Sequence, residues 1–442
     1  MAENNSGADF FGTASIYDVC FKLAPPVILA QLIQALYNIV DSYFVGQSSG
    51  EALTALAVIY PLQWMLMALG LGVGVGVNTL MARCYGEKRL EEAAALGGTG
   101  MVLALVGWLF FCALTWLGLE TYVKYSTNTN QVLEQALSYG YITCFGCLPL
   151  LLESVWTKVH QAEGNMTRPM VGQGIGAAVN IVLDKLLIFG CGSIPALGVV
   201  GAAIATVLGQ AAAAMTVAFG GVRPVPSMDK IASCSRAIVQ AGFPVLLMNA
   251  LFTFYISCLN LVLVAFSEAA VTVLGLYYKV QTFFFLPMIA LQNCLLPFWS
   301  YNYGAKLYDR CQEFFYKAIY IGCGFMGLAA ISFIFFHQEM LGCFSRSEEV
   351  LKIGAVAFPI IGYCFLPANV GLLICNLFLS VGYGRYATLM IVLRQVVLMV
   401  PLSWYLGTWG LEYVWYSFPL TEVTIVIVGS FLYKRKYKDI YK

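Results

Sequence analysis

The sequence predicts an all-α polytopic membrane protein with twelve transmembrane helices in two six-helix bundles related by pseudo-two-fold symmetry. Of its 442 residues, 60% are hydrophobic and only 11% are charged, whereas a soluble domain has roughly 25% charged residues. The mean hydropathy is +0.78. Twelve apolar runs are long enough to cross about 30 Å of hydrocarbon as helices of about 20 residues, and the two halves of the chain repeat each other.

The twelve runs are separated by short polar connections. Their approximate limits are 21–45, 53–82, 93–117, 134–158, 168–190, 197–220, 237–264, 269–299, 312–336, 349–376, 386–407 and 411–433. We assign 19 of the 24 Lys and Arg residues, Arg394 among them, to the connections on one side. The positive-inside rule then places both termini in the cytoplasm. A multi-pass protein of the cell membrane is therefore expected, and residues 1–15 lack the pattern of a signal peptide.

The repeat appears as three matched pairs of residues at a single offset of 218 positions. The pairs are Pro26 with Pro244, Gly86 with Gly304, and Gly164 with Gly382. Three matches at one offset indicate duplicated six-helix bundles, and an even number of helices gives both copies the same orientation. The predicted domains are an N-lobe at 1–220, a polar cytoplasmic linker at 221–235, and a C-lobe with a basic tail at 236–442.

Two carboxylates interrupt the apolar runs of the N-lobe. Asp41 lies in the first run and Asp184 in the fifth, with Asn180 one turn before Asp184 on the same helix face. An ionised Asp in hydrocarbon costs about 2.5–3.5 kcal/mol on insertion scales, so such a residue indicates a functional site. At the repeat offset the two acids fall on Leu259 and Leu402. The duplication kept the scaffold and not the acids, which points to ion-coupled transport through the N-lobe.

Several classes of function find little support in the composition. A net charge of +1 gives no basic surface for nucleic acid, and no GxxxxGK[ST] motif for a nucleotide occurs. The two histidines, His160 and His337, are isolated, so neither a transition-metal site nor an enzyme is expected. The fourteen cysteines sit singly in apolar runs and are expected to be packed as small hydrophobic residues.

Motifs in both halves resemble those of the multidrug and toxic compound extrusion (MATE) transporters, in particular their DinF-like prokaryotic branch. They are VDSYFVG, YGEK with NYGAK, QAEGNMTRP, NIVLDKLLIFG and GAAIAT, and the resemblance extends from about Ser15 to Tyr433. It implies two six-helix lobes around a central cavity and export of organic compounds, often cationic and aromatic, against H+ or Na+. No cofactor other than the coupling ion and no partner besides the bilayer and small substrates are expected, and the protein is expected to be a monomer.

Carried over residue by residue, the resemblance implies an ion site of Asp41, Asn180, Asp184 and Thr206. Their depths in the predicted helices would let all four meet in the outer leaflet. Two carboxylates away from water do not both stay ionised, and the same oxygens suit Na+, so H+ and Na+ remain alternatives. Two structurally capped aspartates, or a pairing with Lys185, is the competing explanation.

The same resemblance implies other functional positions. The family's counterparts of four residues line the N-lobe cavity, where aromatic faces favour flat cations: Gln34, Tyr37, Asn38 and Tyr139. Pro26 is a candidate hinge, and a proline at the start of the helix is the equally weighted alternative.

Three further charged residues lie deep in the runs. Lys279 and Glu422 each lie about ten residues inside the outer ends of their helices, and we predict a buried ion pair between them rather than a role in substrate binding. Glu153 has no assigned role. The runs at 237–264 and 349–376 carry no deep acid, which disfavours a C-lobe carboxylate mechanism. A flippase for a lipid-linked or amphipathic precursor is the alternative function, although it would need a basic groove.

Overall fold

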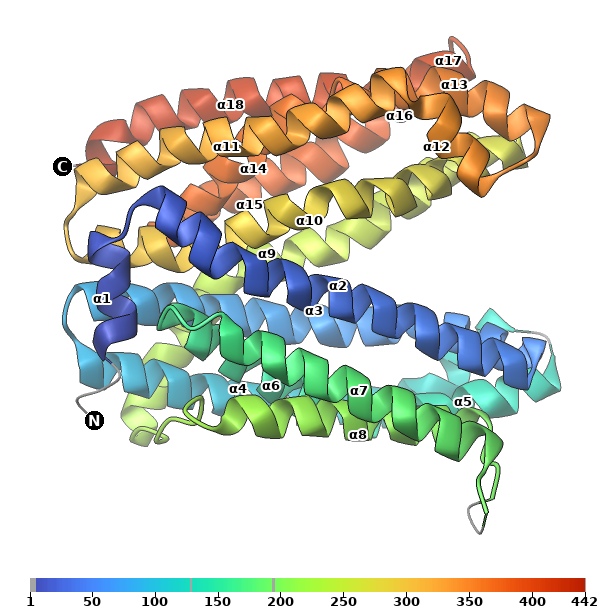
Figure 1. Ribbon diagram of the computed structural model, residues 1–442, viewed down its shortest axis with the longest axis horizontal. Helices are drawn as coiled ribbons and strands as arrows, with labels where there is room; N and C mark the ends of the chain where they lie inside the picture. Colours follow the sequence, from blue (N-terminus) through green and yellow to red (C-terminus); the bar gives the residue numbers. More distant parts are fainter. Residues whose placement is uncertain (1–4, 128, 193–194, 442) are drawn as a thin grey trace. The chain divides into compact units, whose positions relative to one another are not determined.

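The computed structural model describes residues 5–127, 129–192 and 195–441, with the side chains of residues 5–8 left out. Within these ranges the chain folds into helices joined by short connections (Figure 1). Ten of the described helices are long and apolar enough to span a membrane. Two further pairs of helices each form one bent span, which brings the total to as many as twelve. The predicted all-helical membrane fold is therefore confirmed.

The described chain divides into two compact units by packing. Among the described residues, the first unit comprises residues 5–13, 21–127, 129–192 and 195–246, and the second comprises residues 14–20 and 247–441. The predicted division into an N-lobe, a cytoplasmic linker and a C-lobe stays a prediction. Nine helices of the described chain begin before residue 246, where the first unit ends. They are α1 (Asn5–Thr13), α2 (Ile16–Ser48), α3 (Gly50–Gly86), α4 (Leu90–Ser126), α5 (Asn130–Phe145), α6 (Leu148–Ala162), α7 (Thr167–Phe189), α8 (Val199–Ala218) and α9 (Met228–Val264).

The helices that follow belong to the second unit. They are α10 (Glu268–Gly304), α11 (Tyr308–Phe335), α12 (His337–Phe344), α13 (Glu348–Gly362), α14 (Phe365–Ser380), α15 (Gly384–Val392), the π-helical segment η1 (Leu393–Met399), α16 (Val400–Gly407), α17 (Leu411–Val414) and α18 (Ser417–Ile440). The segments α15, η1 and α16 together form one candidate span, Gly384–Gly407.

Local structure repeats at the offset found in the sequence. Helices α3 and α10 both have 37 residues, and each begins at a serine N-cap that accepts a hydrogen bond from the backbone three residues on: Ser49 and Ser267. After these helices Lys88 and Lys306 share the same left-handed φ of 59°, a conformation uncommon for residues other than glycine. The bent spans also correspond, because α5–α6 bends by 43° and α13–α14 by 48°.

Two prolines lie inside α2 rather than at its beginning. Helix α2 starts at Ile16, so more than two turns precede Pro25 and Pro26. The start of this helix was predicted near residue 21, and the helix-start explanation of Pro26 is therefore wrong. Pro244 likewise lies inside α9. An internal proline removes one backbone hydrogen bond and kinks a helix, and the role of Pro26 as a hinge stays a prediction.

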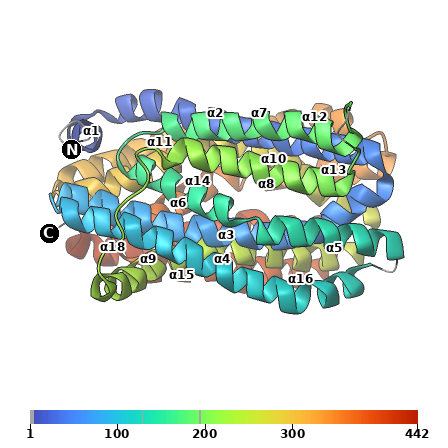
Figure 2. The ribbon, with the colours of Figure 1, turned by 90° about the horizontal axis from the view of Figure 1, so that it is seen from below.

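Helices α7 and α8 pack closely side by side in the first unit (Figures 1 and 2). Glycines permit this approach. A Cβ atom at Gly209 would lie 2.8 Å from the Cβ of Asn180, and one at Gly176 would lie 2.8 Å from the carbonyl oxygen of Gly209. Small residues are the usual means by which membrane helices bring their backbones together. The contact sets Asn180 of α7 against α8 at the level of the turn that carries Thr206.

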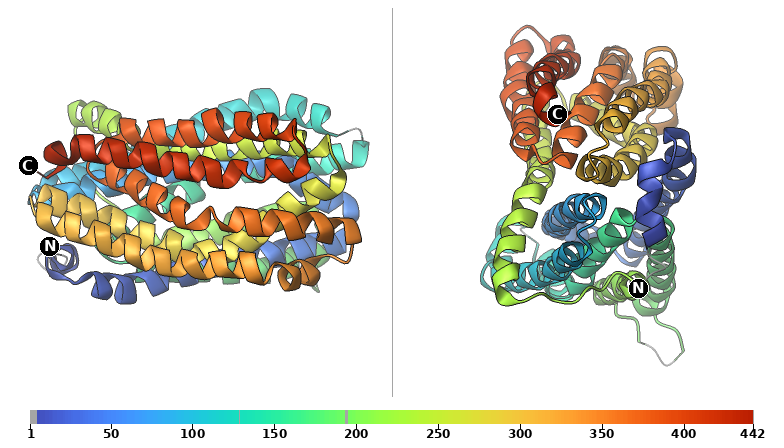
Figure 3. Two further views of the ribbon diagram at one scale, coloured as in Figure 1. Left: turned by 90° about the horizontal axis from the view of Figure 1, so that it is seen from above. Right: turned by 90° about the vertical axis from the view of Figure 1, so that its left-hand side faces the viewer.

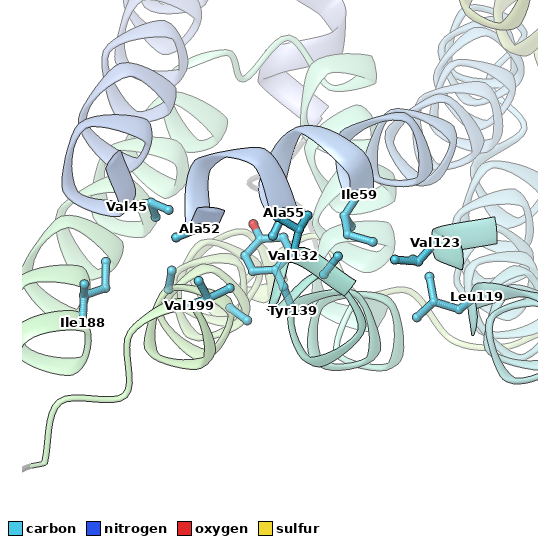
Figure 4. Packing of buried hydrophobic residues seen from close by; sticks show 13 residues of the cluster. Val45, Ala52, Ala55, Ile59, Leu119, Val123, Val132, Tyr139, Ile188 and Val199 are labelled. Carbon is cyan, nitrogen blue, oxygen red and sulfur yellow. The ribbon is translucent and has the colours of Figure 1, made fainter. Parts of the chain in front are cut away.

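An apolar cluster fixes the neighbouring helices of the same unit. It contains residues of α2, α3, α4, α5, α7 and α8, and Tyr139 of α5 is one of its members (Figure 4). Tyr139 is 2% exposed, so its ring is packed while its hydroxyl supplies a polar group inside the bundle.

In the second unit α14 packs against α11 and α18, and α18 also packs against η1. Figure 3 shows the red C-terminal helix α18 running alongside the orange-red helices of its unit. Because π-helical turns are rare and often occur at functional sites, the contact between η1 and α18 is of particular interest.

Candidate functional site

The structure brings the two predicted intramembrane acids together. Asp41 of α2 is 9% exposed and Asp184 of α7 is fully buried. Their carboxyl groups lie within hydrogen-bonding reach of each other, although neither can donate unless one of them carries a proton. Asn180 and Thr206, which are 1% and 4% exposed, complete the predicted set of four. We call Asp41, Asn180, Asp184 and Thr206 the acid site.

Helix geometry places these residues at one level. Asp184 lies five residues before the end of α7, Asp41 seven residues before the end of α2, and Thr206 seven residues after the start of α8. At 1.5 Å per residue these depths are about 8, 10 and 10 Å. Three helices therefore deliver oxygen atoms to the same layer of the first unit.

Many polar atoms of the acid site lack hydrogen-bond partners among the described residues. They are Asp41 Oδ1, both carboxylate oxygens of Asp184, Oδ1 and Nδ2 of Asn180, and Thr206 Oγ1. Buried polar groups are hydrogen-bonded in the great majority of cases, so this concentration calls for an explanation. A shared proton, or a hard cation held by carboxylate, amide and hydroxyl oxygens, would satisfy these atoms.

Two tyrosines border the acid site. Tyr37 of α2 and Tyr139 of α5 both approach the hydroxyl of Thr206, without completing a hydrogen bond of standard geometry. Gln63 of α3 donates to the Tyr139 hydroxyl at 3.2 Å. Gln63 was not predicted as a site residue, although a signal for it exists in the sequence, because Gln281 occupies the equivalent position of the repeat.

The remaining predicted positions of the N-terminal half are less closely tied to the acids. Gln34 is half-buried and Asn38 is exposed, so their role as cavity residues stays a prediction. Lys185 follows Asp184 but lies on an exposed face, and in the described part of the chain it forms no ion pair with either aspartate. The alternative of a Lys185-paired acid therefore does not apply.

Glu153 of α6 is a third buried acid in the first unit. It is 7% exposed, and its Oε1 accepts hydrogen bonds from Thr157 Oγ1 at 2.9 Å and from Gln173 Nε2 at 3.0 Å. Gln173 lies on α7, eleven residues before Asp184, so both side chains project from the same face of that helix. Glu153 is thus a satisfied carboxylate, in contrast to the two aspartates.

The predicted pair of Lys279 with Glu422 is wrong. Lys279 is exposed on α10, whereas Glu422 of α18 is 3% exposed and pairs with Arg394 of η1. The Nε and Nη2 atoms of Arg394 lie 2.7 and 2.6 Å from Glu422 Oε1. Arg394 was assigned to a cytoplasmic connection, yet it lies ten residues inside the span that begins at Gly384. A long arginine is tolerated there because a carboxylate on the adjacent helix compensates its charge.

Comparisons with known proteins agree with this architecture. The chain is 23% identical over 436 residues to a FAD transporter of Shewanella oneidensis, covering 96% of this chain and 95% of that protein. It is 23% identical over 422 residues to the multidrug export protein MepA of Staphylococcus aureus, covering 93% and 92%. A crystal structure of MATE in the bent conformation superimposes with a TM-score of 0.90 at 20% identity, covering 98% of each chain.

Fold, spans and relatives together define a multi-pass membrane transporter. The chain belongs to the MatE family, whose model matches residues 26–186 and 244–405. The two matched segments start 218 residues apart, which is the offset of the internal repeat. The family resemblance seen in the sequence motifs is confirmed.

Proposed function

We propose that this protein is a secondary active antiporter that exports small organic compounds from the cytoplasm in exchange for H+ or Na+. The observation that carries the proposal is the acid site, where two buried carboxylates face each other and lack partners among the described residues. A cation entering the site would be bound only while the carboxylates are ionised and not already occupied by a cation. Alternating access would then link its entry to the departure of the substrate.

The energetics suit such an exchange. One cation that enters across 100 mV releases about 2.3 kcal/mol, which supports roughly a 50-fold gradient of a neutral substrate. Exchange of one H+ for one monovalent organic cation would be electroneutral and would use only the pH gradient. Two aspartates leave room for a second proton, so transport of a cationic compound should respond to voltage.

Two substrate classes follow from the relatives' names. A multidrug export protein suggests cationic aromatic compounds, whereas a FAD transporter suggests an anionic aromatic dinucleotide. The half-buried Tyr37 beside the acid site favours a flat cation in the first unit. We further propose a cell-membrane location with cytoplasmic termini, a monomeric state, the N-lobe, linker and C-lobe division at 1–220, 221–235 and 236–442, and no cofactor besides the coupling ion.

The decisive assay is efflux of ethidium from everted vesicles under separately imposed H+ and Na+ gradients. We expect the wild type to respond to one of the two gradients and Asp41→Asn to lose that response while still binding ethidium. Lys185→Gln is the matched control, because it removes a charge next to Asp184 from an exposed face. Normal gradient-driven efflux by Asp41→Asn would overturn the proposal.

A further inference from the structure

Arg394 has unused hydrogen-bonding capacity. Its Nε and Nη2 atoms both contact the same oxygen of Glu422, Oε1. The opposite edge of the guanidinium, which carries Nη1 and the outer hydrogen of Nη2, has no partner among the described residues. The side chain is nevertheless 25% exposed, whereas that of Glu422 is only 4% exposed. The accessible face of the pair is therefore the arginine, with the carboxylate behind it.

The geometry of this pair is unusual for a purely structural ion pair. An arginine fork normally matches both oxygens of a carboxylate. Here both nitrogens contact Oε1, and Glu422 Oε2 is buried without a partner among the described residues. The pair is therefore incompletely satisfied, and it involves a π-helical segment, a feature that often occurs at functional sites.

A second donor, the hydroxyl of Tyr255, lies in the neighbourhood of the ion pair. Tyr255 of α9 and Tyr278 of α10 share one hydrogen bond of 3.0 Å between their hydroxyl groups. Two hydroxyls carry two protons, so one phenolic proton has no acceptor in the described part of the unit. Tyr255 is electrostatically coupled to both Arg394 and Glu422. The free edge of Arg394 and this phenolic proton are both hydrogen-bond donors, and together they suit a ligand with acceptor oxygens.

Aromatic rings adjoin these donors. The ring of Phe252 lies 5.5 Å from that of Tyr255 and 5.9 Å from that of Tyr278, both edge to face. Tyr278 is half-buried and Phe252 is 36% exposed. Such a cluster offers ring surfaces for a flat ligand next to the guanidinium.

We propose that Arg394 and Tyr255 form an oxyanion-binding site in the second unit, which holds the carboxylate or phosphate of an aromatic substrate against Phe252 and Tyr278. The free edge of Arg394 is a bidentate donor for such a group. Glu422 orients the guanidinium of Arg394 and competes with the ligand for its hydrogen bonds, so it is a positioning residue. This inference rests on the proposed transport function, but it concerns binding at equilibrium, which needs no ion gradient.

The test compares two flavins that share one ring system. Flavin mononucleotide carries a phosphate and riboflavin does not, and quenching of their fluorescence by the purified protein reports binding. We expect Arg394→Gln to weaken flavin mononucleotide binding by about tenfold to a hundredfold, because a hydrogen bond to a charged group is lost. Riboflavin binding should change little. Lys279→Gln, which removes an exposed cation from α10, is the matched control and should leave both affinities unchanged.

Glu422→Gln separates this site from a structural ion pair. We expect it to preserve or raise the affinity for flavin mononucleotide, because it removes the negative charge that competes for Arg394. The double variant Arg394→Gln/Glu422→Gln, which leaves no unpaired charge, checks that weak binding does not come from misfolding. Equal weakening by both single variants, no preference of the wild type for flavin mononucleotide over riboflavin, or binding of dihexanoyl phosphatidic acid without binding of flavin mononucleotide would overturn the proposal.

Discussion

Two helix pairs at equivalent positions of the repeat, α7–α8 and η1–α18, differ in how buried charged side chains are compensated. The offset of 218 residues places Arg394 at the position of Gly176 and Glu422 at that of Ile204. In the first pair, glycines bring the backbones together, and Asp184 of α7 lacks a partner among the described residues, as does Oδ1 of Asp41 on α2. In the second pair, an arginine and a glutamate neutralise each other. The repeat conserves helix placement, whereas the chemistry belongs to each copy separately.

The difference suggests that the two regions have different functions, with cation binding at the acid site and orientation of a hydrogen-bond donor at the Arg394–Glu422 pair. An uncompensated pair of carboxylates is suited to take up and release a cation, because its charge changes with occupancy. A compensated ion pair keeps its net charge and is suited to orient a donor. The predictions below challenge this comparison, beginning with the largest expected effect.

The acid site should behave as one unit. Asp41→Asn and Asp184→Asn should each reduce the gradient-driven component of efflux by about 5- to 150-fold, the usual range of coupling between two sites. The double variant should be little worse than either single variant, because the two carboxylates act as one coupled site. Initial efflux rates from proteoliposomes with an imposed gradient measure this.

Glu153→Gln is the matched control for the pair. It removes a buried acid of the same unit whose Oε1 already accepts two hydrogen bonds, and coupling should persist. Additive losses from Asp41→Asn and Asp184→Asn, or a loss of coupling in Glu153→Gln as severe as theirs, would contradict a two-carboxylate site.

Stability should respond in opposite directions in the two regions. Glu422→Gln leaves the half-buried Arg394 without its charged partner, and we expect a loss of stability below the about 3–5 kcal/mol that breaking a fully buried pair costs. Asp184→Asn removes one of two facing carboxylates and should leave the stability unchanged or raised. Thermal unfolding of the purified proteins in detergent at a fixed pH measures both shifts. The comparison fails if the two variants unfold at the same temperature.

Close packing of α7 on α8 should be required for the acid site. Gly209→Ala puts a methyl group 2.8 Å from the Cβ of Asn180, and overpacking of this kind costs about 1–3 kcal/mol. We expect lower thermal stability together with weaker ion coupling. Gly275→Ala on α10 is the control, since nothing lies within 4 Å of the added methyl group. If Gly209→Ala kept wild-type ion coupling, close packing of α7 on α8 would not be required to position Asn180.

The smallest effect is expected at Gln63. Gln63→Leu removes the 3.2 Å hydrogen bond to the Tyr139 hydroxyl, a contribution of about 0.5–1.5 kcal/mol. The affinity for ethidium should fall several-fold, with coupling retained. Gln281→Leu at the equivalent position of the repeat is the control. A larger effect of Gln281→Leu than of Gln63→Leu would assign dye binding to the second unit.

The sequence was sufficient to predict the spans, the repeat and the proximity of Asp41 and Asp184, whereas Thr206 was placed with them by the family resemblance and the role of the acid site stays a prediction. Asp41, Asn180 and Asp184 could be found because acids and amides in apolar runs are rare and costly, and helix periodicity relates Asn180 to Asp184. The bends in α5–α6 and α13–α14 and the internal position of Pro26 were not predicted, because helix ends are weakly encoded and α2 continues through its prolines.

The partner of Glu422 was predicted incorrectly for a physical reason. Depth along a helix gives the level of a side chain but not its direction around the axis or its neighbours, so Lys279 matched Glu422 in depth and yet lies exposed. The π-helical segment around Arg394 changes the helical register, which no 3.6-residue pattern anticipates. The contact between Gln63 and Tyr139 depends likewise on the packing of α3 on α5.

The central claim is tested most directly by counting the cations that the purified protein releases when substrate binds. Ethidium is added to the protein in weakly buffered detergent solution, and released H+ is followed with a pH indicator dye and released Na+ with a sodium-sensitive dye. We predict release of one of the two ions by the wild type and by Lys185→Gln, and none by Asp41→Asn or Asp184→Asn. Equal release by the wild type and Asp41→Asn at matched ethidium occupancy would contradict the assignment of coupling to the acid site.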